Sequence, residues 1–235
     1  MHGFNLKILG SSSKGNSYIL KADNETLLLE CGVSFKQIQK GLDFNLLGIV
    51  GCLVSHEHQD HSKSIKELTR RGIKVYSAQE TFTTLGIKSH NAVGIKPLQK
   101  FNIGNFEILP FDVEHDAVAP LGFLITHKSF GKLLFATDTY YIKYKFQDLN
   151  YLMIECNFSH KIIEKRIENN ELHPHVAKRL FHSHMSLETV SKFLRDNDTS
   201  KLKEIYLMHL SEKNSDAEHF KKSIEKQTGI ITTIC

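Results

Sequence analysis

The chain contains little cysteine, and no two cysteines stand close together. The four cysteines, Cys31, Cys52, Cys156 and Cys235, are scattered over 235 residues. Zinc ribbons and small secreted domains both need cysteines at short, repeated spacings, so the sequence excludes both classes. Isolated thiols are typical of proteins in a reducing compartment, and we therefore expect a cytoplasmic protein.

Long hydrophobic runs are also missing. The longest, residues 46–54, contains two glycines and is far shorter than the roughly 20 residues that a membrane helix needs. The sequence reaches a strand-like segment at residues 4–9 without the charged and apolar regions of a signal peptide. We therefore expect no membrane contact.

The sequence has no basic tail. Lys and Arg number 30 against 26 Asp and Glu, and residues 160–235 share this balance with 13 basic and 11 acidic residues. Nucleic-acid binding would therefore need a shaped groove. Internal repeats, low-complexity tracts and an obvious linker are absent, so we expect residues 1–235 to form a single domain.

Histidine, by contrast, is abundant, with 14 residues, and residues 56–61 read His-Glu-His-Gln-Asp-His directly after an apolar run. In an extended segment alternate side chains share one side, so His56, His58 and Asp60 would converge. The turn that begins a helix would place His61. Imidazole and carboxylate groups are ligands of zinc and, with more oxygen ligands, of manganese. The segment therefore indicates half of a two-metal site.

The pattern of apolar residues predicts an α/β fold. Strands are expected at residues 4–9, 18–20, 27–29, 49–54, 75–76, 106–108, 111–113, 122–126, 133–136, 151–154 and 205–208. Helices are expected at residues 34–42, 62–71 and 79–85, over most of 162–194, and after residue 211. Ligand-type residues repeatedly follow strand ends, which is where α/β sheets place their sites.

The segment Gly10–Ser17 is rich in glycine and serine, as in a phosphate-cradling loop. It is not a P-loop, because Asn16-Ser17 stands in place of Lys-Ser/Thr and no long helix follows. A tight hairpin turn is the alternative.

Several stretches together resemble one known family. They are the histidine-rich residues 56–61 and the segments Gly10–Ser17, Phe111–Val118, Ala136–Thr139, Ile154–Asn157 and His209–Asn214. In them the chain resembles the metallo-β-lactamase superfamily and, within it, the WalJ group (also called YycJ or VicX), over nearly its whole length. The resemblance implies an α/β fold in four layers, an αββα sandwich with its metals at one edge.

The resemblance further implies two divalent metal ions per chain, zinc or manganese. Seven residues would hold them: His56, His58 and His115 one ion, Asp60, His61 and His209 the other, with Asp138 bridging. Two such ions about 3.5–4 Å apart can share a water and lower its pKa. Glu30 stands where the group usually has Asp, and it would support the site from behind.

The segment His184-Met185-Ser186 resembles the His-x-Ser element that phosphodiesterases of this fold, including tRNA 3′-end processing enzymes, use against the scissile phosphate. Its flanks, Ser183 and Leu187, depart from the glycine and asparagine common in the group. The resemblance implies that His184 is catalytic and that Ser186 and Ser211 contact substrate. Three further histidines are expected to be surface or groove residues: His173, His175 and His182.

These inferences favour a dinuclear metal-dependent phosphodiesterase, foremost a nuclease, because the resembled group is associated with 5′ to 3′ DNA exonuclease activity. A metal-bridging hydroxide, oriented by Asp60, would attack phosphorus, while His184 stabilises the phosphate or protonates the leaving oxygen.

Three alternatives stay open. A phosphodiesterase for cyclic mononucleotides or other small nucleotides would need few phosphate contacts, which fits the absence of a basic arm. A thioesterase or lactonase of the glyoxalase II type shares the ligands but leaves His184 without a task. A non-catalytic module would be expected to have lost a ligand. The expected partner is thus DNA or a small nucleotide, and a homodimer is one assembly to consider.

Overall fold

The chain folds as two units, each built from two separate segments. The computed structural model describes residues 4–235. Unit 1 consists of residues 117–131 and the described part of residues 1–112, and unit 2 consists of residues 113–116 and 132–235. Since neither unit is one continuous stretch of chain, no single linker separates them. The expectation of one domain stays a prediction.

Unit 1 contains a six-stranded sheet and an antiparallel three-stranded segment. Its strands are β1 (Asn5–Ser12), β2 (Gly15–Ala22), β3 (Glu25–Leu29), β4 (Ile49–Leu53), β5 (Val75–Ala78), β6 (Ala92–Ile95), β7 (Phe101–Ile103), β8 (Phe106–Asp112) and β9 (Leu121–His127). The six-stranded sheet has the order β1-β2-β3-β4-β5-β6. Strands β1 to β3 pair antiparallel, β3 to β6 pair parallel, and β7 to β9 pair antiparallel.

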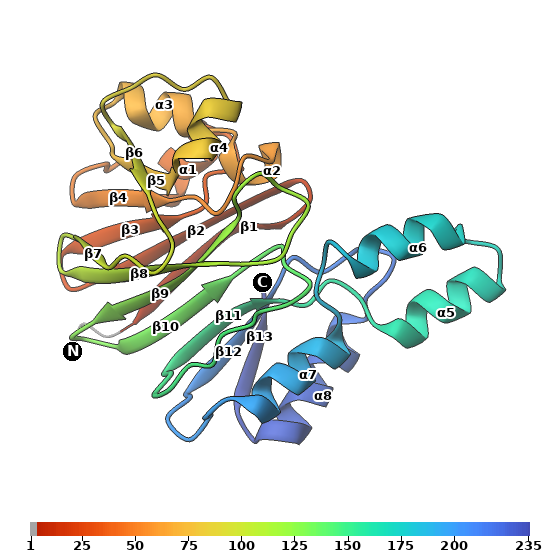
Figure 1. The fold of residues 1–235 in the computed structure, drawn as a ribbon. Coiled ribbons are helices and arrows are strands. Elements are labelled where there is room, and N and C mark those ends of the chain that lie inside the picture. The colour runs from red at the N-terminus through yellow and green to blue at the C-terminus, as the bar shows by residue number, and fades with distance from the viewer. Residues whose placement is uncertain (1–3) are drawn as a thin grey trace. The chain divides into compact units, whose positions relative to one another are not determined.

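The helices of unit 1 are α1 (Phe35–Gly41), α2 (Gln59–Ser62), α3 (Ile65–Arg70) and α4 (Gln79–Thr84). Helices α1, α3 and α4 lie on one face of the six-stranded sheet (Figure 1). Ile38 of α1, Leu68 of α3 and Phe82 of α4 share one buried cluster with Leu28 of β3 and Cys52 of β4. Burying a large apolar side chain stabilises the fold by about 1.5–3 kcal/mol. This packing fixes β3 and β4, whose ends carry candidate site residues.

Unit 2 is organised around a parallel sheet. Its strands are β10 (Gly131–Ala136), β11 (Tyr151–Glu155), β12 (Glu204–Met208) and β13 (Ile231–Ile234), and they pair in that order. Its helices are α5 (His160–Glu168), α6 (Pro174–Phe181), α7 (Leu187–Asp196) and α8 (Ala217–Thr228). Helices α7 and α8 lie beside this sheet, whereas α5 and α6 form a helical hairpin (Figure 1).

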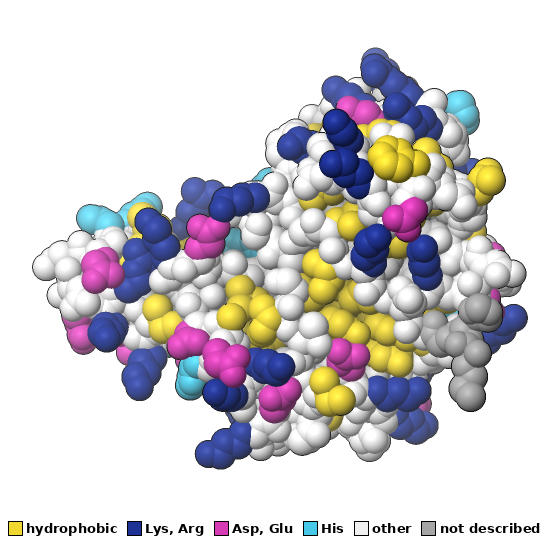
Figure 2. Space-filling model, turned by 180° about the vertical axis from the view of Figure 1, so that it is seen from behind, with side chains coloured by type: hydrophobic (Ala, Val, Ile, Leu, Met, Phe, Trp, Pro, Cys, Tyr) yellow, Lys and Arg dark blue, Asp and Glu magenta, His cyan; other side chains and the backbone are white. Residues whose placement is uncertain are grey.

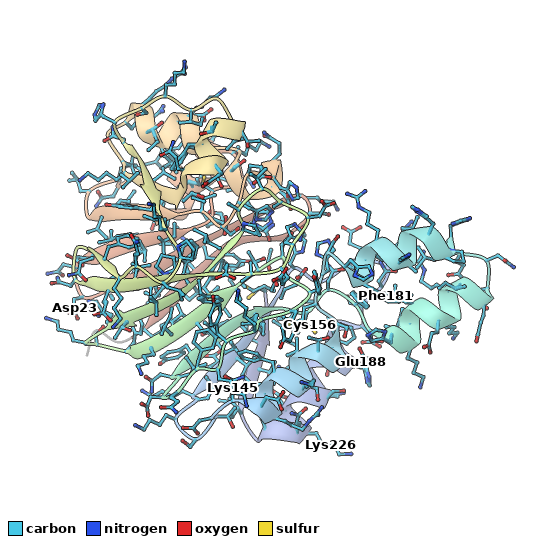
Figure 3. All side chains as sticks on the ribbon, viewed as in Figure 1. Asp23, Lys145, Cys156, Phe181, Glu188 and Lys226 are labelled. Atoms are coloured by element: carbon cyan, nitrogen blue, oxygen red, sulfur yellow. The ribbon has the colours of Figure 1, made fainter. Side chains whose placement is uncertain are left out.

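The α5–α6 hairpin has a small hydrophobic cluster of its own. Phe158, Ile163 and Ala177 are buried there, and Leu180 and Phe181 pack against them. Figure 3 labels Phe181 at the end of α6. The hairpin therefore holds its two helices together by side chains that face inward. The exposed residues of α6 include His175, Lys178 and Arg179 and one apolar side chain, Val176.

The α/β class and most elements agree with the sequence predictions, but some local details differ. Residues 62–71 do not form one helix, because the chain breaks between α2 and α3, where the Ser64 hydroxyl donates to the Val33 carbonyl. In the segment Gly10–Ser17 the hairpin alternative is confirmed, since Ser12 pairs with Gly15. Strands β6 and β13 were not predicted.

Among residues 4–235, no helix combines the length and the apolar character that crossing a membrane requires. Each of the four cysteines is a free thiol rather than half of a disulfide.

Candidate metal centre

The carboxyl ends of three parallel strands bring candidate ligands of unit 2 together. Strands β10, β11 and β12 run parallel in register. Asp138 follows β10, Glu155 ends β11 and His209 follows β12. One ligand atom from each of these residues and one from His184 all lie within 4.8 Å of one another. The sheet therefore gathers carboxylates and imidazoles that are far apart in sequence.

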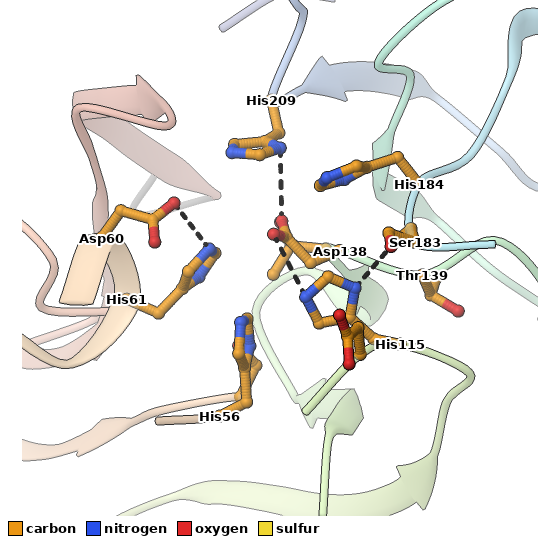
Figure 4. A network of polar contacts seen from close by, with 12 residues as sticks. His56, Asp60, His61, His115, Asp138, Thr139, Ser183, His184 and His209 are labelled. Carbon is orange, nitrogen blue, oxygen red and sulfur yellow. Dashed lines mark hydrogen bonds and ion pairs between the residues drawn. The ribbon is translucent and has the colours of Figure 1, made fainter. Parts of the chain in front are cut away.

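The Asp138 carboxylate faces two histidines with its two oxygens (Figure 4). Oδ1 lies 3.3 Å from His209 Nδ1, and Oδ2 lies 3.7 Å from His115 Nε2. The Thr137 hydroxyl also donates to Oδ1, at 2.9 Å. Only 4% of the Asp138 side chain is exposed. Two oxygens directed at different histidines are the arrangement that a bridging carboxylate requires.

The hydrogen bonding of His115 determines which ring nitrogen can bind a metal. Nδ1 lies 2.7 Å from the Ser183 carbonyl oxygen (Figure 4). Because a carbonyl only accepts, Nδ1 must carry the proton, and Nε2 keeps its lone pair. Burial lowers the pKa of His115, and the raising effect of Asp138 does not cancel it. His115 is therefore held as the neutral imidazole that acts as a ligand.

Glu155 and His184 form a buried pair beside these residues. His184 Nδ1 donates to Glu155 Oε1 at 2.6 Å, and Oε2 accepts the backbone N–H groups of Thr139 at 2.8 Å and Met185 at 3.1 Å. Burial lowers the pKa of His184, but the Glu155 charge and hydrogen bond outweigh it, so that the pKa is raised. Burial raises the pKa of Glu155, but His184 and the other donors outweigh it, so that the pKa is lowered. Both directions favour an imidazolium beside a carboxylate.

In unit 1 a buried carboxylate supports the histidine-rich segment, as the sequence predicts. Glu30 follows β3, and Ser55 lies just after β4, the neighbouring parallel strand. The Ser55 backbone N–H donates to Glu30 Oε1 at 3.0 Å, and His61 Nδ1 lies 3.5 Å from Oε2. On the other side of the ring, Asn16 Nδ2 lies 3.1 Å from His61 Nε2. Burial raises the pKa of Glu30 despite the opposing effect of His61 and Ser55.

The four candidate ligands of unit 1 lie close together. The centroid of the His56 ring lies 4.6 Å from the centroid of the His58 ring and 4.3 Å from that of the His61 ring. Asp60 Oδ2 lies 3.3 Å from His61 Nε2 (Figure 4). Asp60 belongs to α2, so the prediction that it converges by strand alternation is wrong. The helical turn, which begins after the extended His58, places it instead.

Three of the residues that follow strands have left-handed backbone conformations. The φ angles are 60° at Glu30, 40° at Asp138 and 54° at His209. Residues other than glycine rarely adopt this backbone conformation, and each one that does lowers the stability of the fold by on the order of 1–3 kcal/mol. The same conformation occurs outside the candidate site, at Asp23, Asp43, Phe44, Leu98, Asp148 and Asn170, so it does not by itself mark the site.

The two serines that are predicted to contact substrate, Ser186 and Ser211, both make hydrogen bonds within unit 2. Ser186 is the N-cap of α7, is 2% exposed, and accepts the Thr189 backbone N–H at 3.1 Å. The Ser211 hydroxyl accepts Asn214 Nδ2 at 3.1 Å. Their contact with substrate stays a prediction. Similarly, His173 caps α6 by accepting the His175 backbone N–H at 3.2 Å.

Sequence reasoning did not assign Glu155 to the site, and it missed Asn16 and Asn157. Asn157 Nδ2 donates to the His209 carbonyl at 2.8 Å. A signal for Glu155 was present, because a carboxylate directly ends the apolar run 151–154. The two asparagines stand in segments that carry the family resemblance, Gly10–Ser17 and Ile154–Asn157, but only the folded chain shows which histidine each one contacts.

The donors suit the metals that the family resemblance implies. The seven predicted ligands are five imidazoles and two carboxylates, which is the nitrogen and oxygen set that binds zinc or manganese. Within unit 2, the ring orientation of His115 is fixed through its second nitrogen by a hydrogen bond, as is usual for metal-binding histidines. The residues of each unit therefore fit a metal-binding role.

Comparison with known proteins gives matches over almost the whole chain. The family model described as the beta-lactamase superfamily domain matches residues 25–210. Exodeoxyribonuclease YycJ of Bacillus anthracis is 30% identical over 243 residues, which cover 95% of this chain and 89% of that protein.

Two solved structures have a similar fold. The metallo-β-lactamase fold protein YhfI from Bacillus subtilis matches with a TM-score of 0.75 and 18% identity, covering 100% of this chain and 97% of that one. The short form of human tRNase Z matches with a TM-score of 0.60 and 14% identity, covering 98% and 95%. These likenesses confirm the fold class predicted from the sequence, the metallo-β-lactamase fold.

Proposed function

Because the chain belongs to the beta-lactamase superfamily, we propose that it is a dinuclear-metal-dependent phosphodiesterase and, specifically, a DNA exonuclease acting 5′ to 3′. The relative named an exodeoxyribonuclease spans nearly the whole chain, which supports a nucleic-acid substrate. The free thiols fit a reducing compartment, and we propose a cytoplasmic location.

The family pattern assigns the seven ligands already described to two divalent ions. His56, His58 and His115 would hold one ion, and Asp60, His61 and His209 the other, with Asp138 shared. When bound, such ions activate a water as nucleophile and neutralise charge on the phosphate. Side chains of this chain would supply the proton donor and would orient the attacking water.

The observation that carries the proposal is the buried Glu155–His184 pair. Glu155 accepts the Nδ1 proton of His184 at 2.6 Å, and the Glu155 charge raises the pKa of His184, which favours a second proton on Nε2. The His184 side chain is still 19% exposed, so Nε2 can donate to a phosphate oxygen or to the departing oxygen. Such a donor typically contributes about 10²–10⁴ in rate. A thioesterase would have no evident need for this cation.

Asp60 has the second catalytic role in the proposal. Its side chain is 22% exposed, so its carboxylate can accept a hydrogen bond from the attacking water and orient it. Glu155, which touches His184 and His209 rather than the substrate, positions those two rings.

One experiment separates the candidate functions. Metal-loaded protein is incubated in parallel with 5′-labelled duplex DNA, 5′-labelled RNA, cyclic mononucleotides and a thioester. Release of mononucleotides from the 5′ end of DNA is expected. Turnover confined to cyclic mononucleotides would instead favour the small-nucleotide phosphodiesterase, and turnover of the thioester alone would overturn the phosphodiester assignment. His184→Ala is the matched control, because it removes the proton donor without removing any of the seven proposed ligands.

A further inference from the structure

Helix α6 presents a basic face that the proposed catalytic residues do not use. His175, Lys178, Arg179 and His182 are exposed, and their spacing of three, four and seven residues places them on one side of a helix. The opposite side carries Ala177, which is buried in the hairpin cluster together with Leu180 and Phe181. Residues 172–187 contain no Asp or Glu, so nothing within this segment neutralises the face.

Figure 2 shows the same feature from behind. Over α5 and α6, His side chains and Lys or Arg side chains gather along the upper edge, and a second group of Lys and Arg side chains lies at the top of the view. Basic and acidic residues are nearly balanced in the chain as a whole, but unit 2 has a local basic surface.

The basic face leads to a hollow beside a candidate metal ligand. The hollow has a volume of about 350 Å³ and is lined by Glu114, His115, Asp116, Tyr140, Arg179, His182 and Ser183. Its size falls within the range of about 300–1,000 Å³ that is common for small-ligand sites. Ser183, whose carbonyl orients His115, follows the helix after one further residue. The end of α6 is thus tied to the candidate centre.

We infer that this surface, defined as the exposed face of α6 with the adjoining hollow, binds the backbone phosphates of a nucleic-acid strand and leads that strand to the candidate centre. The inference rests on the proposed function and deepens it, because it specifies which surface of the chain holds the nucleic-acid strand. The four side chains span seven residue steps, about 10 Å, the axial length of about three nucleotides in one B-form strand. Tyr140, whose ring lies edge-on to His182 at 6.0 Å between centroids, offers an aromatic face to a base.

Two acidic residues, Glu114 and Asp116, also line the hollow, and Asp116 competes directly for Arg179. Asp116 Oδ2 lies 3.7 Å from Arg179 Nη2, with the two side chains 69% and 77% exposed. An exposed pair of this kind is weak, so a phosphate with its charge-assisted, bidentate hydrogen bonding to Arg179 can replace Asp116. Lys178 supplies a second positive charge on the same face.

The test measures binding separately from catalysis. Metal-loaded protein is titrated onto a fluorescein-labelled, fully phosphorothioate-linked 20-nucleotide DNA strand, which resists cleavage, from 50 to 200 mM NaCl. In the double variant Lys178→Gln/Arg179→Gln, the plot of log affinity against log salt should become less steep, its negative slope shrinking in magnitude by about 1.4. Each lost single-strand phosphate contact accounts for about 0.7 of this change. At 50 mM salt the affinity should fall by roughly 10- to 100-fold. An RNA strand of equal length serves as a second arm and shows whether the surface prefers DNA.

The matched control is Lys222→Gln/Lys226→Gln on α8, which removes the same charge from exposed positions and should leave the slope unchanged. Charge reversal at residues 178 and 179 should weaken binding further. If wild-type protein cleaves DNA but the α6 variant keeps the wild-type salt slope, or if the α8 control loses as much, the docking surface is refuted while the proposed function stands. If the α6 variant alone loses slope and no DNA is cleaved, the surface is supported and the nuclease assignment fails.

Discussion

Replacement of Glu155 by glutamine should be more damaging than its conservative shape suggests. Glu155 is fully buried, and its two oxygens accept four hydrogen bonds: from His184 at 2.6 Å and His209 at 3.2 Å on Oε1, and from the Thr139 and Met185 N–H groups at 2.8 and 3.1 Å on Oε2. Glutamine carries one oxygen and one NH₂ group. In either orientation its NH₂ group faces donors.

The expected cost follows from these contacts. Losing a hydrogen bond to a charged group costs about 1.5–3 kcal/mol, and leaving a buried donor unsatisfied costs about 1–3 kcal/mol more. The free energy of unfolding should therefore fall by roughly 3–6 kcal/mol, against a total of about 5–15 kcal/mol for a typical domain. Thermal denaturation should show this as a Tm lower by roughly 6–24 °C.

The catalytic rate should fall in Glu155→Gln because His184 is no longer held in its orientation. In Glu155→Gln, kcat on a DNA substrate should drop by about 10²–10⁴, as in His184→Ala. The double variant should fall no further than the worse single variant, because both changes remove one unit. Glu164→Gln, which changes an exposed glutamate of α5 in the same unit, is the control and should alter neither kcat nor Tm appreciably. Wild-type kcat in Glu155→Gln, or fully multiplied losses in the double variant, would refute the reasoning.

Three further predictions concern neighbouring features. Ser186→Ala should lower the free energy of unfolding by about 1 kcal/mol in urea denaturation, because it removes the cap of α7; KM on a DNA substrate, measured on the same variant, tests the predicted substrate contact, which a large rise would support and an unchanged value would count against. Glu30→Gln should weaken metal binding by about 10–100-fold in competition with a chelating dye, since Glu30 supports His61, and undiminished affinity would count against that support. Chelation should abolish hydrolysis of a phosphodiester, and restored zinc or manganese should raise both activity and Tm; activity that survives complete metal removal would exclude a metal-dependent reaction.

The sequence predicts strands and helices here well because their burial patterns are simple. Residues 133–136 and 151–154 are apolar runs that become the buried parts of β10 and β11. The prediction failed for residues 62–71, where the Ser64 hydroxyl bonds to the distant Val33 carbonyl and the helix breaks. Such side-chain competition for backbone groups cannot be inferred from apolar spacing alone.

For the site, residue type was predictable and placement was not. The residue types of the segment 56–61 indicate metal binding. Asp60, however, is placed by a helical turn rather than by strand alternation. Glu155 becomes a site residue only because β10, β11 and β12 align their carboxyl ends. Pairing between strands whose partner residues are 18 positions apart (Leu133 and Tyr151) and 53 positions apart (Tyr151 and Glu204) is a tertiary property. The basic face of α6 likewise emerges only once Ala177 and Phe181 are seen to pack inward.

Metal stoichiometry tests the central claim most directly. Wild-type protein and Asp138→Ala are reconstituted with excess zinc or manganese, freed of unbound metal, and analysed for metal content per chain. Two ions are expected in the wild type. Far fewer are expected in the variant, because the Asp138 oxygens face both His115 and His209 and one carboxylate would serve both ions. One ion or none in the wild type, or two in Asp138→Ala, would contradict the dinuclear centre.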